Sequence, residues 1–230
     1  TRTRVGLGDP GRQFDWEAAF GRRARHVIDL GCGNGRYLIA SALRRADCDH
    51  LGVELVPPAR RLGSLRAGQR ALTNCKFAWG DASEFIVSRA APGSIDEAHL
   101  YHPQPYYERS KIDRRQLTPR ILAALHRALA PGGVFVFQTD NPAFMRYARE
   151  VVPALFAWSE VEGAWPDDPG GRTLREIVAR SQGLAILRAQ AVKLELADDE
   201  VARRCAVLAE PEFDANKAGY GADERLQHSR

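Results

Sequence analysis

Hydrophobic and polar positions along the chain follow two alternating patterns. Short apolar or alternating runs bounded by turn residues predict strands over residues 26–30, 50–55, 75–79, 94–101, 134–139 and 184–196. Between them, apolar residues at helical spacing predict helices over residues 36–45, 57–70, 82–87, 114–129, 141–151 and 173–181. Such alternation is typical of the α/β class, with a doubly wound and mostly parallel sheet.

The 230 residues suit a single domain with flanking segments. We assign residues 26–196 to this domain, because the alternation of strands and helices extends over them. Residues 1–25 form a basic segment rich in arginine. Residues 197–230 are expected to form one polar helix and then a mobile tail rich in Gly, Asp and Arg.

Composition adds modest constraints. The chain has 33 basic and 29 acidic residues and a net charge of +4, which slightly favours an anionic partner such as nucleic acid. No apolar segment is long enough to cross a bilayer. The four cysteines are scattered without a C-x-x-C pair, so we expect reduced thiols in a cytoplasmic protein, with no disulfide framework and no metal site.

The first predicted strand leads into a glycine-rich loop, at the edge where doubly wound sheets bind ligands. Residues 29–36 read DLGCGNGR, which is a D-x-G-x-G-x-G pattern. A dinucleotide fingerprint would need a third glycine at the position of Arg36. The pattern instead resembles the first motif of the S-adenosylmethionine-dependent methyltransferases, although a structural turn could produce the same letters.

Acidic residues follow the next two predicted strands. Glu54 ends the second strand, where a carboxylate can accept both ribose hydroxyls of a nucleoside. Asp81 follows the third, where methyltransferases usually place an acid on the adenine amino group. Each could alternatively be a solvated loop residue or a helix cap. Together they favour S-adenosylmethionine binding by Asp29, Gly31, Gly33, Gly35, Glu54, Asp81 and Ala82.

A proline-rich loop follows the fourth predicted strand, with the sequence HPQPYYERSKIDRR over residues 102–115. It resembles the loop F-P-D-P-W-x-K-x-R-H-x-K-R-R of the bacterial tRNA (guanine-N7) methyltransferases. The next motifs of that family, L-x-P-G-G, T-D and T-x-x-E, have counterparts in residues 129–133, 139–140 and 173–176. The resemblance covers residues 25 to 195.

The resemblance implies a Rossmann-like methyltransferase fold, with a seven-stranded sheet and helices on both faces. It also implies formation of 7-methylguanosine in tRNA by a monomer or homodimer, without a metal or a membrane. The guanosine would be held by Asp140, Thr173 and Glu176. A reading from the residues agrees for Asp140, because guanine offers hydrogen-bond donors to a carboxylate. Thr173 and Glu176 could equally form a helix capping box.

This chain departs from the family pattern in its loop. Gln104 replaces the family acid, Tyr106 its tryptophan and Glu108 its lysine. Methylation at N7 removes no proton from that atom, so Gln104 and Asp140 could serve catalysis by positioning. RNA would contact Tyr106, Glu108 and the basic pair Arg114 and Arg115. Alternatively, Tyr106 packs within the loop, and the two arginines lie in a solvated first turn of a helix.

Other functions stay open at this stage. His102 occupies the position of an aromatic packing residue of the family, so we assign it a structural role. The alternatives to tRNA methylation are a methyltransferase for another substrate, or a cofactor- or RNA-binding paralogue without activity.

Overall fold

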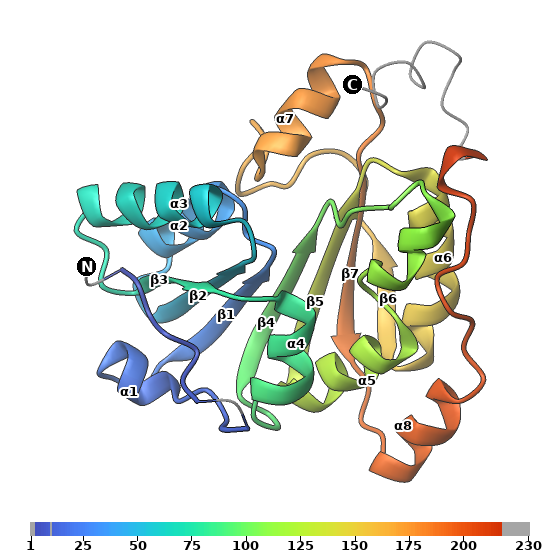
Figure 1. Cartoon of the computed structure of the whole chain (residues 1–230), viewed down its shortest axis with the longest axis horizontal. Coiled ribbons are helices and arrows are strands. Elements are labelled where there is room, and N and C mark those ends of the chain that lie inside the picture. Colours follow the sequence, from blue (N-terminus) through green and yellow to red (C-terminus); the bar gives the residue numbers. More distant parts are fainter. Residues whose placement is uncertain (1–2, 10, 218–230) are drawn as a thin grey trace.

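The computed structural model describes residues 3–9 and 11–217. Within them, seven strands form one sheet in the order β3-β2-β1-β4-β5-β7-β6 (Figure 1). β1 to β5 run parallel, whereas β7 is antiparallel to both of its neighbours, β5 and β6. The strands are β1 Arg25–Leu30, β2 Cys48–Glu54, β3 Cys75–Trp79, β4 Ile95–Tyr101, β5 Leu129–Thr139, β6 Phe156–Glu160 and β7 Leu187–Lys193.

Helices cover both faces of this sheet, so the predicted fold class is confirmed. The helices are α1 Trp16–Phe20, α2 Arg36–Arg44, α3 Pro57–Gln69, α4 Ala82–Glu84, α5 Pro119–Ala128, α6 Pro142–Val151, α7 Leu174–Ser181 and α8 Asp198–Cys205. A π-helical turn, Phe85–Arg89, extends α4, and three 3-10 turns cover Arg109–Arg114, Val152–Ala154 and Ala215–Lys217.

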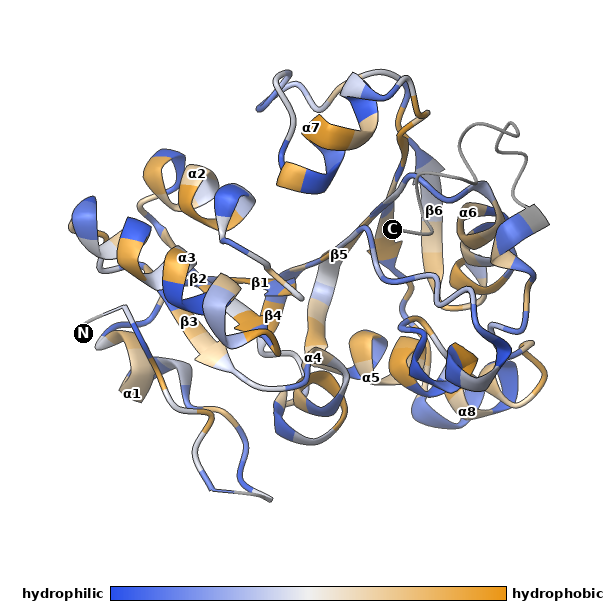
Figure 2. Ribbon diagram, turned by 45° about the horizontal axis from the view of Figure 1, so that its top comes forward, coloured by the Kyte–Doolittle hydropathy of each residue, from blue (hydrophilic) through white to orange (hydrophobic). Residues whose placement is uncertain are grey.

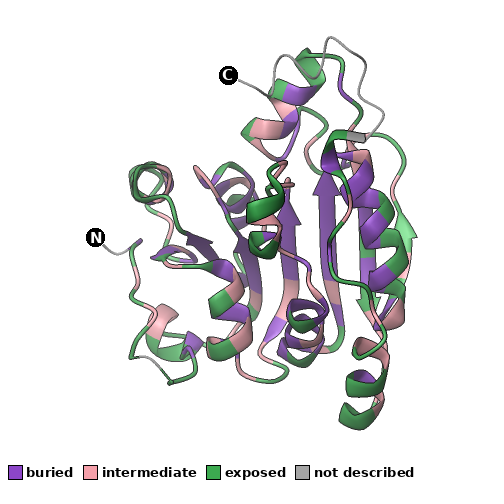
Figure 3. Ribbon diagram, turned by 45° about the vertical axis from the view of Figure 1, so that its right-hand side comes forward, coloured by how far each residue is buried: buried purple, intermediate pink, exposed green. Residues whose placement is uncertain are grey.

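Two hydrophobic layers hold the helices against the strands. The larger layer joins one face of the sheet to α1, α4, α5, α6 and α8, with Phe85, Phe135 and Phe144 fully buried. On the other face, Leu38 of α2 and Ala67 of α3 pack against Phe77 of β3. Figure 2 shows the hydrophobic residues of the strands and helices, and Figure 3 shows the strands buried between exposed helix surfaces.

The order of the strands places a binding site at one edge. The chain winds outward from β1 to β3 and then returns to place β4 on the other side of β1. Loops leaving the carboxyl ends of strands diverge at such a point and open a crevice. The segment that carries α7 lies above this edge of the central strands (Figure 1).

The structure differs from the predicted elements at three places. β6 was not predicted, because it is a five-residue edge strand with one fully buried side chain, Phe156. The predicted helix over 114–129 begins only at Pro119, since Leu117 has a φ of 71° that no helix contains. α1 was also missed, although its first residue, Trp16, and Phe14 just before it belong to the larger core.

The flanking segments pack on the domain where they are described. The Thr3 hydroxyl donates a hydrogen bond to the Ser64 carbonyl, and Arg22 forms an ion pair with Asp49. Near the end of the described chain, Ala215 is buried; residues 218–230 of the expected tail lie outside the described residues. None of the described helices has the length and apolar character that a membrane span requires.

Candidate functional site

The glycine loop between β1 and α2 leaves open space over its backbone. Gly31 and Gly33 have φ values of 79° and 54°, a region that side chains disfavour. A Cβ atom built on either residue would meet nothing within 4 Å. Gly35 caps α2, and a Cβ there would lie 2.5 Å from the Phe77 ring. The loop therefore offers exposed backbone on one side and tight helix packing on the other.

Asp29 lies at the base of this loop with an incomplete set of contacts. The residue is 2% exposed, and its Oδ1 has no hydrogen-bond partner among the described residues. Burial, with a smaller contribution from the charge of Glu54, raises the pKa of Asp29 to about 8. A buried carboxyl without a partner is costly, which favours binding of a cationic or hydrogen-bonding ligand at this position.

Replacing Asp29 by asparagine should stabilise the ligand-free protein, and more so at high pH. The folded carboxyl keeps its proton up to about pH 8, whereas an unfolded one loses it near about pH 4. The wild-type protein therefore loses stability as pH rises between these values. We expect Asp29→Asn to raise the free energy of unfolding by about 1–3 kcal/mol more at pH 8 than at pH 5. Urea unfolding at both pH values measures it, and a pH-independent difference would contradict it.

The other two acids predicted to bind cofactor are held by backbone amides. Glu54, at the end of β2, accepts hydrogen bonds from the Gly33 and Val56 amides at 2.8 and 2.7 Å. Asp81 caps α4 through the Ser83 and Glu84 amides, so the capping alternative describes its observed contacts. Neither acid, nor Ala82 or Gly35, lines the cavity described next. Glu54 is nevertheless connected to the cavity wall, because its carboxylate accepts a hydrogen bond from the amide of Gly33, which lines the cavity.

A cavity of about 680 Å³ opens beside the glycine loop, within the size range of small-molecule sites. Its walls come from the glycine loop and its flanks within 29–37, Ala59 in α3, residues 101–105 and Tyr107 at the start of the proline-rich loop, residues 139–141 at the end of β5, and residues 173–175 at the start of α7. Six residues predicted from the sequence lie in this lining: Asp29, Gly31, Gly33, Gln104, Asp140 and Thr173. Segments far apart in the sequence thus meet at the predicted edge of the sheet.

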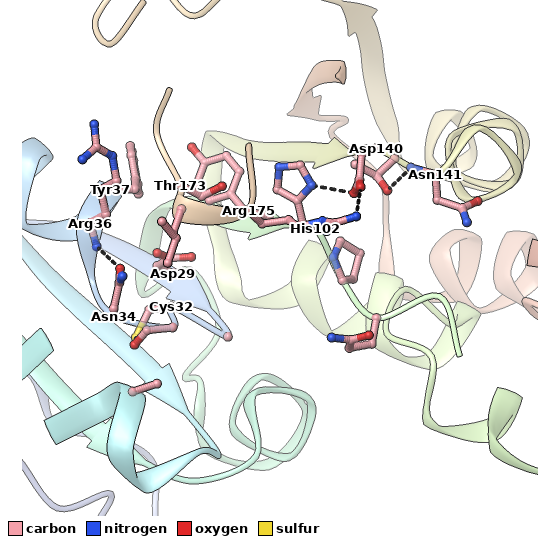
Figure 4. A pocket seen from close by; sticks show the side chains of 18 of the residues that line it. Asp29, Cys32, Asn34, Arg36, Tyr37, His102, Asp140, Asn141, Thr173 and Arg175 are labelled. Carbon is pink, nitrogen blue, oxygen red and sulfur yellow. Dashed lines mark hydrogen bonds and ion pairs between the residues drawn. The ribbon is translucent and has the colours of Figure 1, made fainter. Parts of the chain in front are cut away.

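Asp140 forms the polar centre of the wall opposite the glycine loop (Figure 4). His102 Nδ1 donates a hydrogen bond to its Oδ1 at 2.9 Å, and Arg175 forms an ion pair with its Oδ2. Burial alone would raise the pKa of Asp140, but His102 and Arg175 outweigh it and lower the pKa to about 2. The carboxylate is therefore ionised at neutral pH and presents only acceptor atoms.

The tautomer of His102 follows from a chain of hydrogen bonds behind it. Trp165 Nε1 can only donate, and its bond to Gln138 Oε1 at 2.5 Å orients the Gln138 amide. The amide nitrogen then donates to His102 Nε2 at 2.8 Å. His102 must accept at Nε2 and carry its proton on Nδ1, which faces Asp140. The sequence assigned His102 to packing, but it directly fixes the Asp140 carboxylate.

Thr173 and Glu176 separate into two roles. Thr173 caps α7 by accepting from the Glu176 amide at 3.0 Å, and it also lines the cavity. Glu176 is fully buried and forms a 2.5 Å ion pair with Arg188. It also accepts from the Arg172 amide and from the Gln138 side chain. The Glu176 carboxylate is thus outside the cavity, and its direct contact with a base has no support in this arrangement.

The proline-rich loop directs its side chains differently from the sequence prediction. Gln104 and Tyr107 line the cavity, whereas Tyr106 does not. Positive φ values at His102 and Tyr106, 48° and 43°, bracket the two prolines. Such values are uncommon outside glycine and cluster at functional sites. Beyond the loop, Glu108 is exposed and forms an ion pair with Lys111 at 2.7 Å.

Arg115 requires a correction. Its neighbour Arg114 is exposed, as expected for an RNA contact, but Arg115 is only 2% exposed. Its guanidinium donates hydrogen bonds to four backbone carbonyls instead. Two successive arginines in a 3-10 turn and its cap face different directions, so a basic pair in the sequence does not make a basic pair on the surface.

Sequence reasoning also missed two arginines that shape the α7 side of the cavity. Arg175 lines the cavity and contacts Asp140. Arg172 stacks on Trp165 at 4.0 Å and donates to the Tyr101 hydroxyl at 2.8 Å. Arg172 directly precedes the T-x-x-E motif and Arg175 lies within it, and this was the available signal for them. They join the start of α7 to the strands below it.

A comparison with protein families decides the family of this chain. The model of a family described as "Putative methyltransferase" matches residues 23–189, a range that contains the glycine loop and every lining segment of the cavity. The chain belongs to this family. Members of the methyltransferase family use S-adenosylmethionine, which is therefore the cofactor.

Two relatives are similar to this chain over much of its length. The tRNA (guanine-N(7)-)-methyltransferase of Burkholderia pseudomallei (strain 1710b) is 32% identical over 173 residues, 73% of this chain and 63% of that protein. The protein of the same name from Paraburkholderia xenovorans (strain LB400) is 33% identical over 148 residues, 64% of this chain and 55% of that protein. The chain thus spans less than two thirds of the length of these relatives.

Solved structures share the fold of this chain. The 16S rRNA methyltransferase KamB superimposes with a TM-score of 0.57 at 15% identity, covering 77% of this chain and 92% of that one. The antibiotic-resistance methyltransferase Kmr gives a TM-score of 0.54 at 20% identity, covering 80% and 93%. At such low identity the likeness concerns the fold alone.

The residues of the site fit the cofactor chemically. The open backbone over Gly31 and Gly33 gives a ligand close access to main-chain amides. The unpartnered Asp29 oxygen suits a cofactor that carries positive charge on its sulfonium and amino groups. Among the described residues, no group of His, Cys, Asp and Glu could hold a metal ion.

Proposed function

We propose that this methyltransferase forms 7-methylguanosine in tRNA, with S-adenosylmethionine held by Asp29, the glycine loop and Glu54. The observation that carries the proposal is the position of Asp140. Its ionised carboxylate lies in the same cavity as the glycine loop, on the opposite wall. The relatives named above as tRNA (guanine-N(7)-)-methyltransferases support the same substrate.

The chemistry needs acceptors and alignment more than a strong base. The bound cofactor supplies an electrophilic methyl group on a sulfonium, and the lone pair of guanine N7 would take it without loss of a proton from N7. Asp140 can accept hydrogen bonds from the Watson–Crick donors of guanine. Gln104, which lies in the proline-rich loop, can orient the base through its amide. Alignment of this kind supplies a large share of the barrier reduction in group transfer.

A label-transfer assay tests this proposal. The purified chain is incubated with an unmodified tRNA transcript and S-adenosylmethionine that carries an isotopically labelled methyl group. We expect label in the RNA that depends on both the tRNA and the chain. Absence of label at saturating concentrations of both substrates would reject the proposed activity.

Gln104 favours one second candidate, a paralogue that binds cofactor and RNA without methyl transfer, because it replaces the family acid. Calorimetry shows whether the chain binds both substrates, and the label-transfer assay then separates the two candidates. The paralogue would bind S-adenosylmethionine and tRNA with ordinary affinity and transfer no label. The proposed enzyme binds both substrates and transfers it.

Replacing Gln104 by aspartate should keep the fold and at least preserve methyl transfer. The side chain is exposed to the cavity, and aspartate keeps an acceptor oxygen and restores the acid of the family loop. Thermal unfolding checks the fold, and single-turnover rates on one tRNA transcript check the transfer. Gln104→Ala, which lacks any acceptor, is the matched control and should be slower than both. Loss of transfer in Gln104→Asp with an intact fold would show that the amide itself is required.

Binding of tRNA should weaken steeply with salt. Arg109 and Arg114 are exposed beside the cavity, and neutralised phosphates release counterions. The double variant Arg109→Ala and Arg114→Ala should reduce the slope of log affinity against log salt by about 2. Filter binding at several salt concentrations measures this slope. Arg149→Ala is the control, because it removes an arginine of α6 that forms an ion pair with Glu160 of β6. An equal change of slope in this variant would mean that Arg109 and Arg114 do not contact RNA phosphates specifically.

A further inference from the structure

Arg115 joins two segments that are about a hundred residues apart in the chain. Its Nε donates to the Pro105 carbonyl at 2.5 Å, and its Nη2 donates to the Tyr106 carbonyl at 2.9 Å. Its Nη1 donates to the carbonyls of Pro211 and Phe213 at 2.6 and 2.7 Å. The guanidinium also lies over the Phe213 ring, 4.0 Å from its centre. One side chain therefore holds four carbonyls of two loops.

The far end of this contact is a segment that we call the C-terminal strap, residues 209–217. It is fixed to α6, since the Tyr147 hydroxyl donates to the Ala209 carbonyl at 2.9 Å. Phe213 packs against the rings of Phe144 and Tyr147 at 5.1 and 5.5 Å. At its end, Ala215 is buried and its carbonyl accepts from Asn141 Nδ2 at 3.4 Å. The strap thus reaches the residue that follows Asp140.

The near end of the contact is a wall of the cavity. Pro103, Gln104, Pro105 and Tyr107 all line it. Prolines restrict this loop, but their nitrogens cannot donate hydrogen bonds, so its carbonyls need donors from elsewhere. Arg115 supplies them at Pro105 and Tyr106. Its fork of rigid N–H groups makes several such bonds at once, which a lysine cannot do.

We propose that Arg115 and the C-terminal strap form a clamp that positions the proline-rich loop, and with it Gln104, relative to Asp140. The clamp connects the two walls of the cavity that would hold the guanosine, while the glycine loop lies on the other side of it. In this role Arg115 is a positioning residue and contacts no phosphate. Its effect on methyl transfer rests on the proposed function, but its effect on the loop does not.

Limited proteolysis tests the clamp without any RNA. Chymotrypsin cleavage after Tyr106 or Tyr107 is followed by mass spectrometry, because loop opening exposes these bonds. Arg115→Ala and a truncation after Glu210 should each accelerate this cleavage by at least about tenfold. Combining them should add less than about twofold, since both remove the same link. Arg114→Ala and a truncation after Lys217, which keeps the strap, are the matched controls and should leave the rate unchanged.

Three results would overturn the clamp. They are unaltered cleavage in both test variants, multiplying effects in the combined variant, or equal acceleration in the two controls. Should Arg115→Ala fail to fold, Arg115→Lys and the truncation after Glu210 decide, and both should accelerate cleavage of the loop. Cleavage at sites within the sheet reports global unfolding and must stay slow for the loop rates to count in favour of the clamp.

The positioning role has a separate readout. Single-turnover methyl transfer at saturating tRNA should fall at least about tenfold in Arg115→Ala and in the truncation after Glu210. The affinity for S-adenosylmethionine should stay within about twofold, because the glycine loop is not part of the clamp. Unchanged transfer with a loosened loop would refute the positioning role. If the unaltered chain methylates no tRNA, the proposed function fails, and the proteolysis result still decides the clamp.

Discussion

The variant Asp140→Asn should lose at least about 100-fold in the single-turnover rate of guanosine methylation, or about 2.7 kcal/mol of transition-state stabilisation. The wild-type carboxylate only accepts, and two donors, His102 and Arg175, already face it. An asparagine amino group would turn a third donor toward one of them or toward the base. His102 cannot relieve the conflict by changing tautomer, since Gln138 donates to its other nitrogen. Buried donors without acceptors are costly.

Cofactor binding separates this effect from a general loss of structure. The affinity of Asp140→Asn for S-adenosylmethionine, measured by calorimetry, should stay within about twofold of the wild type. Asp113→Asn, an exposed aspartate in the same loop region, is the matched control and should transfer at the wild-type rate. If Asp140→Asn transferred methyl groups as fast as Asp113→Asn, the carboxylate would not be the acceptor for the base.

The largest loss of stability is expected from Glu176→Ala, at about 3–5 kcal/mol. Glu176 is fully buried and Arg188 is 6% exposed, so truncation leaves a buried guanidinium without its counter-ion. It also removes the acceptor of the Arg172 amide and of Gln138. A protein of this kind has about 5–15 kcal/mol of stability in total. Urea unfolding should therefore show a much lower midpoint.

Two further variants identify the cause. Glu160→Ala breaks an ion pair with Arg149 that is largely solvent-exposed, and such pairs contribute about 0–1 kcal/mol. Glu176→Gln keeps the size and one acceptor oxygen, so its loss should fall between the other two. A loss in Glu176→Ala no greater than in Glu160→Ala would mean that the buried pair does not hold the base of α7 in place.

Six of the seven strands in the described part of the chain could be predicted because local sequence marks them, and the edge of the sheet where the cavity lies could be predicted from their order. Apolar runs such as 26–30 and 134–139 bury on both faces, and turn residues end them. Once strands and helices alternate, the topology places the glycine loop and Asp140 at one edge. Of the six cavity-lining residues named from the sequence, Asp29 is the penultimate residue of β1, Thr173 caps α7, and the other four follow the ends of strands.

The missed features depend on contacts between distant segments. The role of His102 requires Gln138 and Trp165, and that of Arg115 requires carbonyls of residues 211 and 213. A sequence pattern also cannot show that Glu176 pairs with Arg188 in place of a ligand. For Asp81 the pattern offered a helix cap as one alternative, but it could not show that the carboxylate accepts from the Ser83 amide at the start of α4. In each case the residue type was visible but its partner was not.

Nucleoside analysis of the reaction product tests the central claim most directly. A tRNA transcript methylated by the purified chain is digested to nucleosides and examined by mass spectrometry with authentic methylguanosine standards. The proposed function predicts 7-methylguanosine in the wild-type reaction, and a signal strongly reduced by Asp140→Asn and unaffected by Asp113→Asn. A different methylated nucleoside, or none at all, would contradict it.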